Sequence, residues 1–385
     1  MNPMAKRVSR FGTTIFTEMT ALANEYQAVN LGQGVPDFPT PPFLRQAAAN
    51  AIEAGINQYA PGNGRSRLRT ALADKMARVY GLSVDPDKEI IVMQGATEAI
   101  FATIMGLIDP GDEVIVLEPC YDSYVPSIIM AGGIPRYYTL RPPDWAIKRE
   151  RLATLFTPRT RLILLNTPHN PTGKLFGHEE LTIVAELCQQ HDVIAVVDEV
   201  YEHIVFDGRS HLPLATLPGM ANRTVTISSL GKTFNATGWK VGWAIAAPEI
   251  TQAIFRAHQF ITFCGAAPLQ EAAAAALSVA DEYYTELREM YQRKRDMLVQ
   301  ILTDAGIRPF TPQGTYFIMA DISQFGFADD ISFCRYLTTE IGVAAIPPGS
   351  FYHNPADGAH FARFAFCKTD AALEEAAKRL QKLPH

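Results

Sequence analysis

A lysine in a polar turn is the residue of this chain whose chemistry is most informative. Lys232 lies between Gly231 and Thr233 in the stretch SSLGKTFNATGWKVGW, between the β-branched runs TVTIS and VGWAIA. Its amine could bind a phosphate, form a Schiff base with a carbonyl compound, or remain an ordinary solvated charge. A phosphate-binding P-loop requires a glycine at position 226, where the chain has Thr226, so this alternative fails.

The polar residues around Lys232 bear on the other two alternatives. A solvated loop charge is the common outcome for a single lysine, but it does not explain why Ser229, Thr237, Gly238 and Lys240 crowd the same segment between two apolar strands. A ligand-binding turn would explain this crowding.

Composition limits the class of protein. The 385 residues are 48% hydrophobic and 19% charged, which is enough for a large core and a second, smaller lobe. The net charge of −6 is spread along the chain without a block of like charges, which argues against nucleic acid or an anionic membrane as a partner and favours a small molecule. No stretch approaches eighteen consecutive apolar residues, so we expect no membrane span.

The cysteines indicate the compartment. They are odd in number and far apart, and they form no C-x-x-C pair, so neither a disulfide framework nor a zinc site is expected. A reducing cytoplasm is the expected location. The five are Cys120, Cys188, Cys264, Cys334 and Cys367.

Strand-like and helix-like segments alternate from residue 90 onward. Seven apolar runs, IIVM, VIVL, PRYYTL, RLILLN, VIAVVD, TVTIS and VGWAIA, are separated by helix-length segments. Continuous apolar runs joined by such crossovers predict an α/β fold with a mainly parallel seven-stranded sheet covered on both faces. Ligands of such sheets bind beyond the carboxyl ends of the strands.

Polar residues follow these runs repeatedly. Gly95, Ala96 and Thr97 come between a strand and a helix, where free backbone N–H groups and the helix dipole would attract an anion, although Thr97 could instead be only an N-cap. Asp198 ends the fifth run, and an ionised carboxylate buried there without a partner would cost several kcal/mol. Asp198 must therefore be paired.

The C-terminal part predicts a smaller α+β domain. A helix pattern runs from about Pro268 to Ala305, and IRPF, TYFIMADI, VAAIP and HFARFAF then read as strands interleaved with two helices. We place the boundary inside the long helix. The expected division is residues 1–45 as an N-terminal arm joining the small domain, 46–285 as the large domain and 286–385 as the small C-terminal domain.

Five segments in order resemble the class I and II aminotransferases, the fold-type-I enzymes that depend on pyridoxal phosphate (PLP). The segments that carry the resemblance are LGQGVPDFPTP, NQYAPGNG, NPTG, D-E-x-Y and S-x-x-K-T-x-x-x-x-G-x-K. The resemblance implies the aspartate-aminotransferase-like fold and PLP as cofactor. It implies that Lys232 forms a Schiff base with PLP and that Ser229 and Lys240 hold the PLP phosphate, together with Gly95, Ala96 and Thr97.

The same resemblance assigns the remaining cofactor contacts. Asp198 would face the pyridine nitrogen, and Tyr201 and Asn170 would contact the 3′-oxygen. Tyr121 would stack on the ring. Tyr59 would cross to the cofactor phosphate of a neighbouring subunit, which implies a homodimer with shared active sites.

The substrate contacts follow from the resemblance as well. Arg363 would hold the α-carboxylate of the substrate, and Gly34 would border that carboxylate. Asn170 would also lie against the substrate, and Phe16 would help to wall the side-chain pocket.

The implied activity is ping-pong transamination between an amino acid and a 2-oxo acid. The N-terminal segments look most like the methionine and kynurenine aminotransferase branch, but Cys264 stands where kynurenine aminotransferases tend to carry histidine. We therefore expect a large apolar or aromatic L-amino acid as donor, with methionine favoured.

Three other functions are alternatives to this activity. They are a PLP-dependent cysteine-conjugate C–S β-lyase, a kynurenine- or glutamine-type aminotransferase and a non-catalytic PLP-sensing domain. The last is disfavoured because too few residues precede LGQGVPDF for a DNA-binding helix pair.

Overall fold

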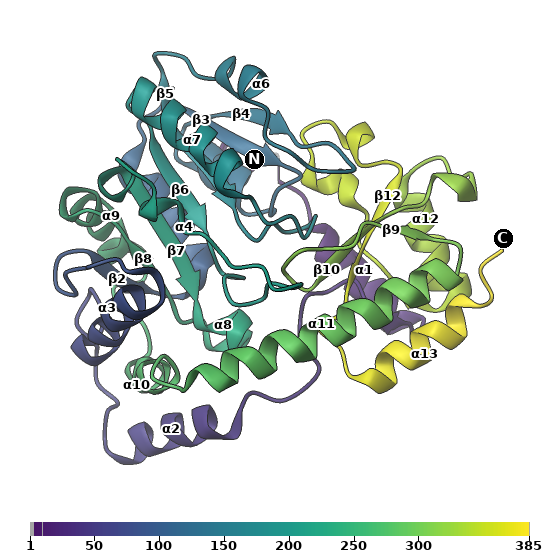
Figure 1. Cartoon of the computed structure of the whole chain (residues 1–385), viewed down its shortest axis with the longest axis horizontal. Helices are drawn as coiled ribbons and strands as arrows, with labels where there is room; N and C mark the ends of the chain where they lie inside the picture. Colours follow the sequence, from purple (N-terminus) through teal and green to yellow (C-terminus); the bar gives the residue numbers. More distant parts are fainter. Residues whose placement is uncertain (1–3, 10, 385) are drawn as a thin grey trace.

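A seven-stranded sheet forms the centre of the larger lobe. The computed structural model describes residues 4–9 and 11–384. The strand order is β2-β8-β7-β6-β5-β3-β4, and β8 is antiparallel to both of its neighbours while the other pairs are parallel. The prediction of a mainly parallel seven-stranded sheet is therefore confirmed (Figure 1). The strands are β2 (Ile90–Met93), β3 (Glu113–Glu118), β4 (Ile134–Thr139), β5 (Thr160–Asn166), β6 (Ile194–Asp198), β7 (Thr224–Ser229) and β8 (Gly242–Ile245).

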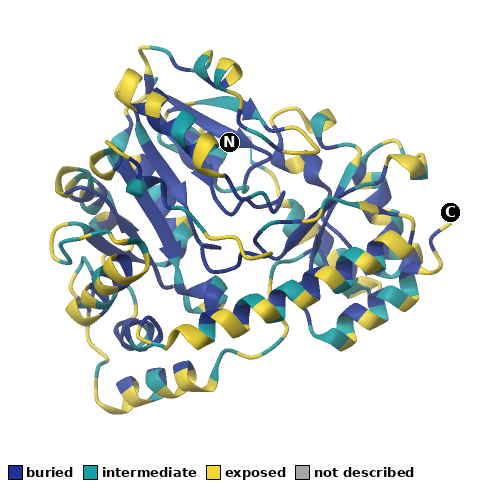
Figure 2. Cartoon of the chain, in the orientation of Figure 1, coloured by how far each residue is buried: buried dark blue, intermediate teal, exposed yellow. Residues whose placement is uncertain are grey.

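Helices cover both faces of this sheet because successive strand side chains point to opposite faces. In β3, Val114 and Val116 belong to the core with α4 (Gly95–Leu107), α5 (Tyr124–Met130) and α9 (Pro248–Ile261). Ile115 and Leu117 belong to the opposite core with α6 (Arg149–Ala153) and α7 (His178–His191). Figure 2 shows the strands buried between helices whose outer faces are exposed.

A third core covers the β2–β8 end of the sheet. It is made with α2 (Pro42–Glu53), α3 (Ser66–Tyr80) and α10 (Ala267–Ala276). The sequence pattern predicted one long helix from about Pro268 to Ala305, and this is wrong. The chain leaves α10 at Leu277 and starts α11 (Asp281–Asp304) after Ala280, where Asp281 and Glu282 place acidic side chains at a new helix N-terminus.

The smaller lobe has its own core and two small sheets. An antiparallel sheet has the order β12-β10-β9, and β1 pairs in parallel with β11, so that the N-terminal arm is joined to the C-terminal part of the chain. The elements are α1 (Ile15–Glu25), β1 (Val29–Asn30), β9 (Arg308–Pro309), β10 (Phe317–Asp321), α12 (Asp330–Tyr336), β11 (Val343–Ala344), β12 (Phe361–Ala365) and α13 (Asp370–Leu380). Helix α12 lies between β10 and β11, together with shorter helical turns, and α13 follows β12.

Helix α11 connects the two lobes. Tyr284 packs in the core of the larger lobe, and Leu287 and Tyr291 pack in that of the smaller one. Figure 1 shows this helix running along both lobes. The division into residue ranges 1–45, 46–285 and 286–385 stays a prediction.

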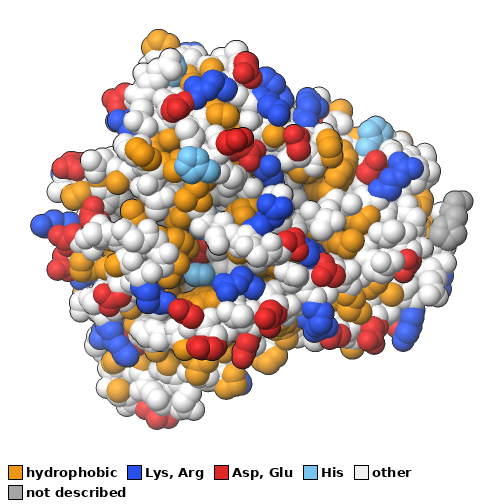
Figure 3. All heavy atoms as spheres, in the orientation of Figure 1, with side chains coloured by type: hydrophobic (Ala, Val, Ile, Leu, Met, Phe, Trp, Pro, Cys, Tyr) orange, Lys and Arg blue, Asp and Glu red, His pale blue; other side chains and the backbone are white. Residues whose placement is uncertain are grey.

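The surface carries mixed charge. Figure 3 shows acidic and basic side chains interspersed over the visible face. None of the helices in the described part of the chain is long and apolar enough to cross a membrane. Within the same residues, no group of three or more His, Cys, Asp and Glu side chains is placed to hold a metal ion.

A buried ion pair ties α3 to the segment that follows β6. Lys75 Nζ lies 2.6 Å from Glu202 Oε1, with both side chains at most 4% exposed. Ser228 Oγ donates to the same carboxylate at 2.9 Å, and Tyr80 Oη donates to its other oxygen. Burial would raise the pKa of Glu202, but Lys75, His203 and the Tyr80 hydrogen bond hold it well below its usual range. The carboxylate is therefore ionised, and its cation is required.

We predict that Lys75→Met destabilises the fold by about 3–5 kcal/mol, because it leaves a buried carboxylate without a counter-charge. The measurement is the urea midpoint of unfolding. Lys88→Met is the matched control, since Lys88 is paired only with Asp85 at the surface, and its midpoint should not change. Equal midpoints for the two variants would contradict the prediction.

Candidate active site

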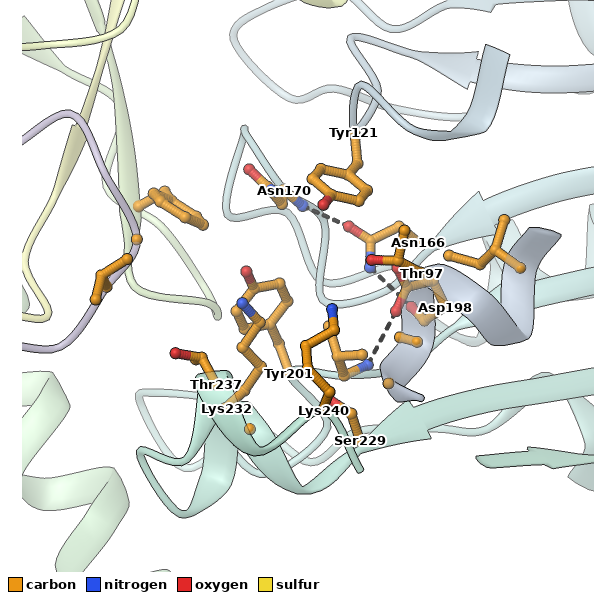
Figure 4. Close-up of a pocket in the computed structure, with 18 of the residues that line it drawn as sticks. Thr97, Tyr121, Asn166, Asn170, Asp198, Tyr201, Ser229, Lys232, Thr237 and Lys240 are labelled. Atoms are coloured by element: carbon orange, nitrogen blue, oxygen red, sulfur yellow. Dashed lines mark hydrogen bonds between the residues drawn. The ribbon is translucent and has the colours of Figure 1, made fainter. Parts of the chain in front are cut away.

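A cavity of about 300 Å³ opens between the two lobes at the carboxyl ends of the central strands. Of the fourteen residues predicted from the sequence, thirteen line it (Figure 4). These are Phe16, Gly34, Gly95, Ala96, Thr97, Tyr121, Asn170, Asp198, Tyr201, Ser229, Lys232, Lys240 and Arg363. Tyr59 does not line it: its side chain is 83% exposed, and its ring packs against that of Phe263 at 5.5 Å between centroids.

The sequence prediction missed several lining residues. Asn166 is the last residue of β5, so it carried the strand-end signal that identified other site residues, whereas Tyr124 is the first residue of α5, three positions after Tyr121. Phe317 begins β10 and carried no such signal, because only the approach of the smaller lobe brings it to the cavity. The other lining residues that were not predicted as site residues are Gln33, Val35, Ile100, Val200, Gly231, Ala236, Thr237 and Val241.

Lys232 lies in a single helical turn, α8 (Leu230–Thr233), at the place where the sequence predicted a tight polar turn. Its Nζ lies 5.6 Å from the ring centroid of Tyr201 and makes no hydrogen bond to the residues that the structure describes. Burial lowers the pKa of Lys232, with Lys240 and Arg363 acting in the same direction and Asp198 opposing them. A lowered pKa leaves more of the amine neutral, which is the nucleophilic form.

Asp198 ends β6 with its carboxylate buried. Tyr124 Oη donates to Oδ2 at 2.7 Å and the Val200 N–H donates to Oδ1 at 3.2 Å. Burial nevertheless raises the pKa of Asp198, since these hydrogen bonds and Lys232 only partly offset desolvation. No salt bridge reaches this carboxylate from the described residues. A cationic group in the cavity would supply the missing charge.

Asn166 fixes the backbone around Asp198. Its Nδ2 donates to the Asp198 carbonyl at 2.7 Å, and its Oδ1 accepts from the Asn170 N–H at 2.7 Å. One side chain thus holds the ends of two neighbouring segments in register, which explains why Asn170 and Asp198 reach the same cavity.

The N-terminus of α4 forms one end of the cavity. The helix begins at Gly95 with Gln94 at the N-cap position, so the alternative that Thr97 is only an N-cap is wrong. A Cβ at Gly242 would lie 2.5 Å from the Gly95 carbonyl carbon, so only glycine lets β8 approach this closely. Lys240 Nζ lies 3.4 Å from where a Cβ of Gly95 would be, and Figure 4 shows it beside this helix end.

This end of the cavity is suited to an anion. Unpaired first-turn N–H groups, the helix dipole, the Ser229 hydroxyl and the Lys240 ammonium converge there.

Arg363 of β12 is a buried guanidinium, 1% exposed. Its Nη1 donates to Asn170 Oδ1 at 3.0 Å and its Nη2 to the Gly32 carbonyl at 2.8 Å, while its Nε has no partner among the described residues. Burial lowers the pKa of Arg363 to about 10, so it remains cationic at neutral pH. A buried cation that has an unused donor, and that pairs with no carboxylate of the described residues, is suited to bind an anionic ligand.

Aromatic rings surround this guanidinium. Its Cζ lies 4.1 Å from the ring centroid of Phe317 and 5.1 Å from that of Phe16. A Cβ at Gly34 would lie 2.4 Å from the Phe317 ring, so glycine is required for the arm to pass there. The tyrosine Tyr201 is also buried, and burial raises its pKa.

Comparison with known proteins agrees with this geometry. The family model for aminotransferase class I and II matches residues 26–380. A probable N-succinyldiaminopimelate aminotransferase of Mycobacterium tuberculosis is 44% identical over 98% of each chain, and the methionine aminotransferase of Escherichia coli is 41% identical over 99% of each. A kynurenine–oxoglutarate transaminase of Dictyostelium discoideum is 43% identical over 98% of this chain and 96% of its own.

Solved structures share the whole fold. The N-succinyldiaminopimelate aminotransferase from M. tuberculosis superposes with a TM-score of 0.96 over 99% of this chain and 100% of its own. Aspartate aminotransferase variants from Thermus thermophilus, 32% identical, reach 0.92 over 100% of both chains. The chain therefore belongs to the class I and II aminotransferases and is a PLP-dependent transaminase.

Proposed function

We propose that this transaminase takes large apolar or aromatic L-amino acids as donors, with methionine favoured, and passes the amino group to a 2-oxo acid in a ping-pong reaction. The distribution of charge in the cavity carries this proposal. The described lining residues include three cations, Lys232, Lys240 and Arg363, and each has a separate task in the roles set out below. None is left for a second carboxylate on the substrate side chain.

The phosphate of PLP fits the helix end of the cavity. Gly95, Ala96 and Thr97 supply the N-terminus of α4, and Ser229 and Lys240 supply a hydroxyl and a cation. These groups match the acceptor oxygens and negative charge of a phosphate monoester.

The ring of PLP fits the floor of the cavity. When bound, PLP supplies an electron sink for the electrons released as the substrate Cα–H bond breaks. Asp198 is assigned to the pyridine nitrogen, because a cation there would compensate the buried carboxylate. Tyr201 and Asn170 are assigned to the 3′-oxygen and Tyr121 to the ring face.

Arg363 is assigned to the substrate α-carboxylate, with Asn170 and Gly34 beside it. Asn170 already accepts from Nη1, so it orients the guanidinium while Nε remains free to donate. Each charge-assisted hydrogen bond gained by the carboxylate contributes about 1.5–3 kcal/mol. Phe16 and Phe317, which flank Arg363, give the substrate side chain apolar walls.

Lys232 is assigned two tasks. Its amine would hold PLP covalently by condensing with the aldehyde and releasing water. When freed by a substrate, Nζ would accept the proton from the substrate Cα as general base and later donate it as general acid. Its lowered pKa favours the neutral form that the first transfer requires.

We predict that Lys232→Ala loses the absorbance of lysine-bound PLP and nearly all turnover, at least the ~10²–10⁴-fold that positioned proton transfer contributes. The measurements are the absorbance spectrum and the transamination rate. Lys88→Ala, at an exposed lysine far along the chain, is the control and should retain both. Full activity in Lys232→Ala would refute the assignment.

For donor selectivity, we predict that methionine and phenylalanine bleach the enzyme-bound cofactor band with kcat/KM at least about tenfold above that of aspartate. An unpaired side-chain carboxylate in an apolar pocket loses its hydration without compensation. The measurement is a donor screen of the purified enzyme that also includes kynurenine and N-succinyl-diaminopimelate.

The same screen separates the alternatives. Arg363→Lys should lower kcat/KM for every amino donor, since all of them share the α-carboxylate. A response to aspartate well above that to methionine would overturn the specificity. Release of pyruvate and ammonia from a cysteine conjugate without any 2-oxo acid would instead indicate the C–S lyase.

We also propose a homodimer in which Tyr59 reaches the partner's cofactor phosphate. Tyr59, Phe260 and Phe263 expose aromatic rings, with 83%, 87% and 50% of their surface open in the single chain, and Phe263 holds a left-handed backbone at φ +68°. Large aromatic rings exposed in the single chain suit burial against a second copy of the chain.

We predict that mixing Lys232→Ala chains with Tyr59→Ala chains restores activity. A mixed dimer contains one site with an intact lysine from one chain and an intact tyrosine from the other. The measurement is transamination before and after subunit exchange, beside sedimentation velocity. No gain above the Tyr59→Ala rate in confirmed mixed dimers would exclude a role across the interface.

A further inference from the structure

A buried histidine lies behind the helix end assigned to the phosphate. His258 of α9 is fully buried, and its Nδ1 lies 2.6 Å from Glu98 Oε1 while its Nε2 lies 2.9 Å from the Gly62 carbonyl oxygen. Carboxylate and carbonyl oxygens only accept hydrogen bonds. Both ring nitrogens therefore have to donate, and the ring that satisfies both contacts is the imidazolium.

Glu98 lies in the first turn of α4, next to Thr97. Its Oε1 also accepts from Thr262 Oγ1 at 2.7 Å, and its Oε2 accepts from the Gln94 N–H at 2.5 Å. Burial alone would raise the pKa of Glu98. His258 and these two donors lower it by more than burial raises it, so the pKa of Glu98 lies below its ordinary value. An ionised carboxylate thus lies within one turn of the N–H groups that would bind the phosphate.

A carboxylate in this position opposes phosphate binding. It occupies the positive end of the helix dipole and repels a second anion there, and the repulsion is strong because the site is partly removed from water. The α4 end can attract a phosphate only when the charge of Glu98 is cancelled. His258 is the one cation whose side chain contacts Glu98 among the described residues.

We propose that His258 is a positioning residue for the cofactor phosphate. Its imidazolium neutralises Glu98, so that the N-terminus of α4 keeps its attraction for the phosphate, and it ties the loop at Gly62 to the same helix end. The inference rests on the proposed placement of the phosphate at Gly95, Ala96 and Thr97. It concerns charge balance, and it gives His258 no contact with substrate.

The test compares PLP with pyridoxal, which lacks the phosphate. Full-length apoenzyme is titrated with each compound, and the dissociation constant is read from the absorbance change on binding to Lys232. His258→Gln keeps one amide donor but removes the cation. The variant should raise the dissociation constant of PLP about tenfold or more, because one uncompensated negative charge then lies about one helical turn from the phosphate. The dissociation constant of pyridoxal should not change.

The double variant Glu98→Gln/His258→Gln decides between charge and packing. It removes both charges and keeps two hydrogen-bonding amides, so it should restore PLP affinity to near the wild-type value. Glu98→Gln alone should also hold PLP as well as the wild type, because it removes the carboxylate that opposes the phosphate, and it tests the inference even if His258→Gln does not fold. Thr262→Val is the matched control, since it removes a neutral donor from the same carboxylate oxygen and should leave the PLP-to-pyridoxal ratio unchanged.

Three results would overturn the inference. The first is an equal loss of affinity for PLP and pyridoxal in His258→Gln. The second is a double variant that binds PLP as weakly as His258→Gln, and the third is a tenfold loss of the preference for PLP over pyridoxal in Glu98→Gln. A failure of the proposed function would look different, because wild-type apoenzyme would then show no absorbance change that depends on Lys232.

Discussion

The structure depends on a buried carboxylate, Asp198, that forms no salt bridge with the residues that the structure describes. Asp198 accepts hydrogen bonds from Tyr124 and from the Val200 N–H, and its pKa is still raised by burial. An ionised carboxylate buried in this way costs free energy unless a cation enters the cavity. A positively charged group of a bound ligand would therefore stabilise this strand end. A protonated pyridine nitrogen is the kind of group that would complete it.

Two basic side chains of the cavity, Lys232 and Arg363, also leave hydrogen-bond donors available for a ligand. Lys232 lies near two tyrosine rings and makes no hydrogen bond to the described part of the chain, and Arg363 is buried among aromatic rings with an unused Nε. Burial lowers the pKa of both groups. The consequence differs between the two. A lysine with a lowered pKa becomes a nucleophile, whereas an arginine with a pKa of about 10 remains a cation that can bind a carboxylate.

The cavity exists only because two lobes meet. The strand ends of the large sheet bring Asp198, Asn170 and Lys232 together, but the apolar wall and the guanidinium come from β10, β12 and the N-terminal arm. Gly34 allows the arm to pass against Phe317, and α11 packs into both cores. The smaller lobe and the N-terminal arm therefore supply one wall of the cavity, while the large sheet supplies the residues at its strand ends.

The sequence by itself determined the sheet and most of the site. Seven apolar runs predicted seven strands, and residues directly after them, such as Asp198 and Lys232, could be placed at one edge because parallel strands end together. Only the tertiary structure decided what depends on contacts between distant segments. It broke the predicted helix between Leu277 and Ala280, and it brought Phe317 to the cavity. It also placed His258 against Glu98, 160 residues away. Local patterns record periodicity and turn chemistry, whereas the meeting of two buried groups is set by packing of the whole chain.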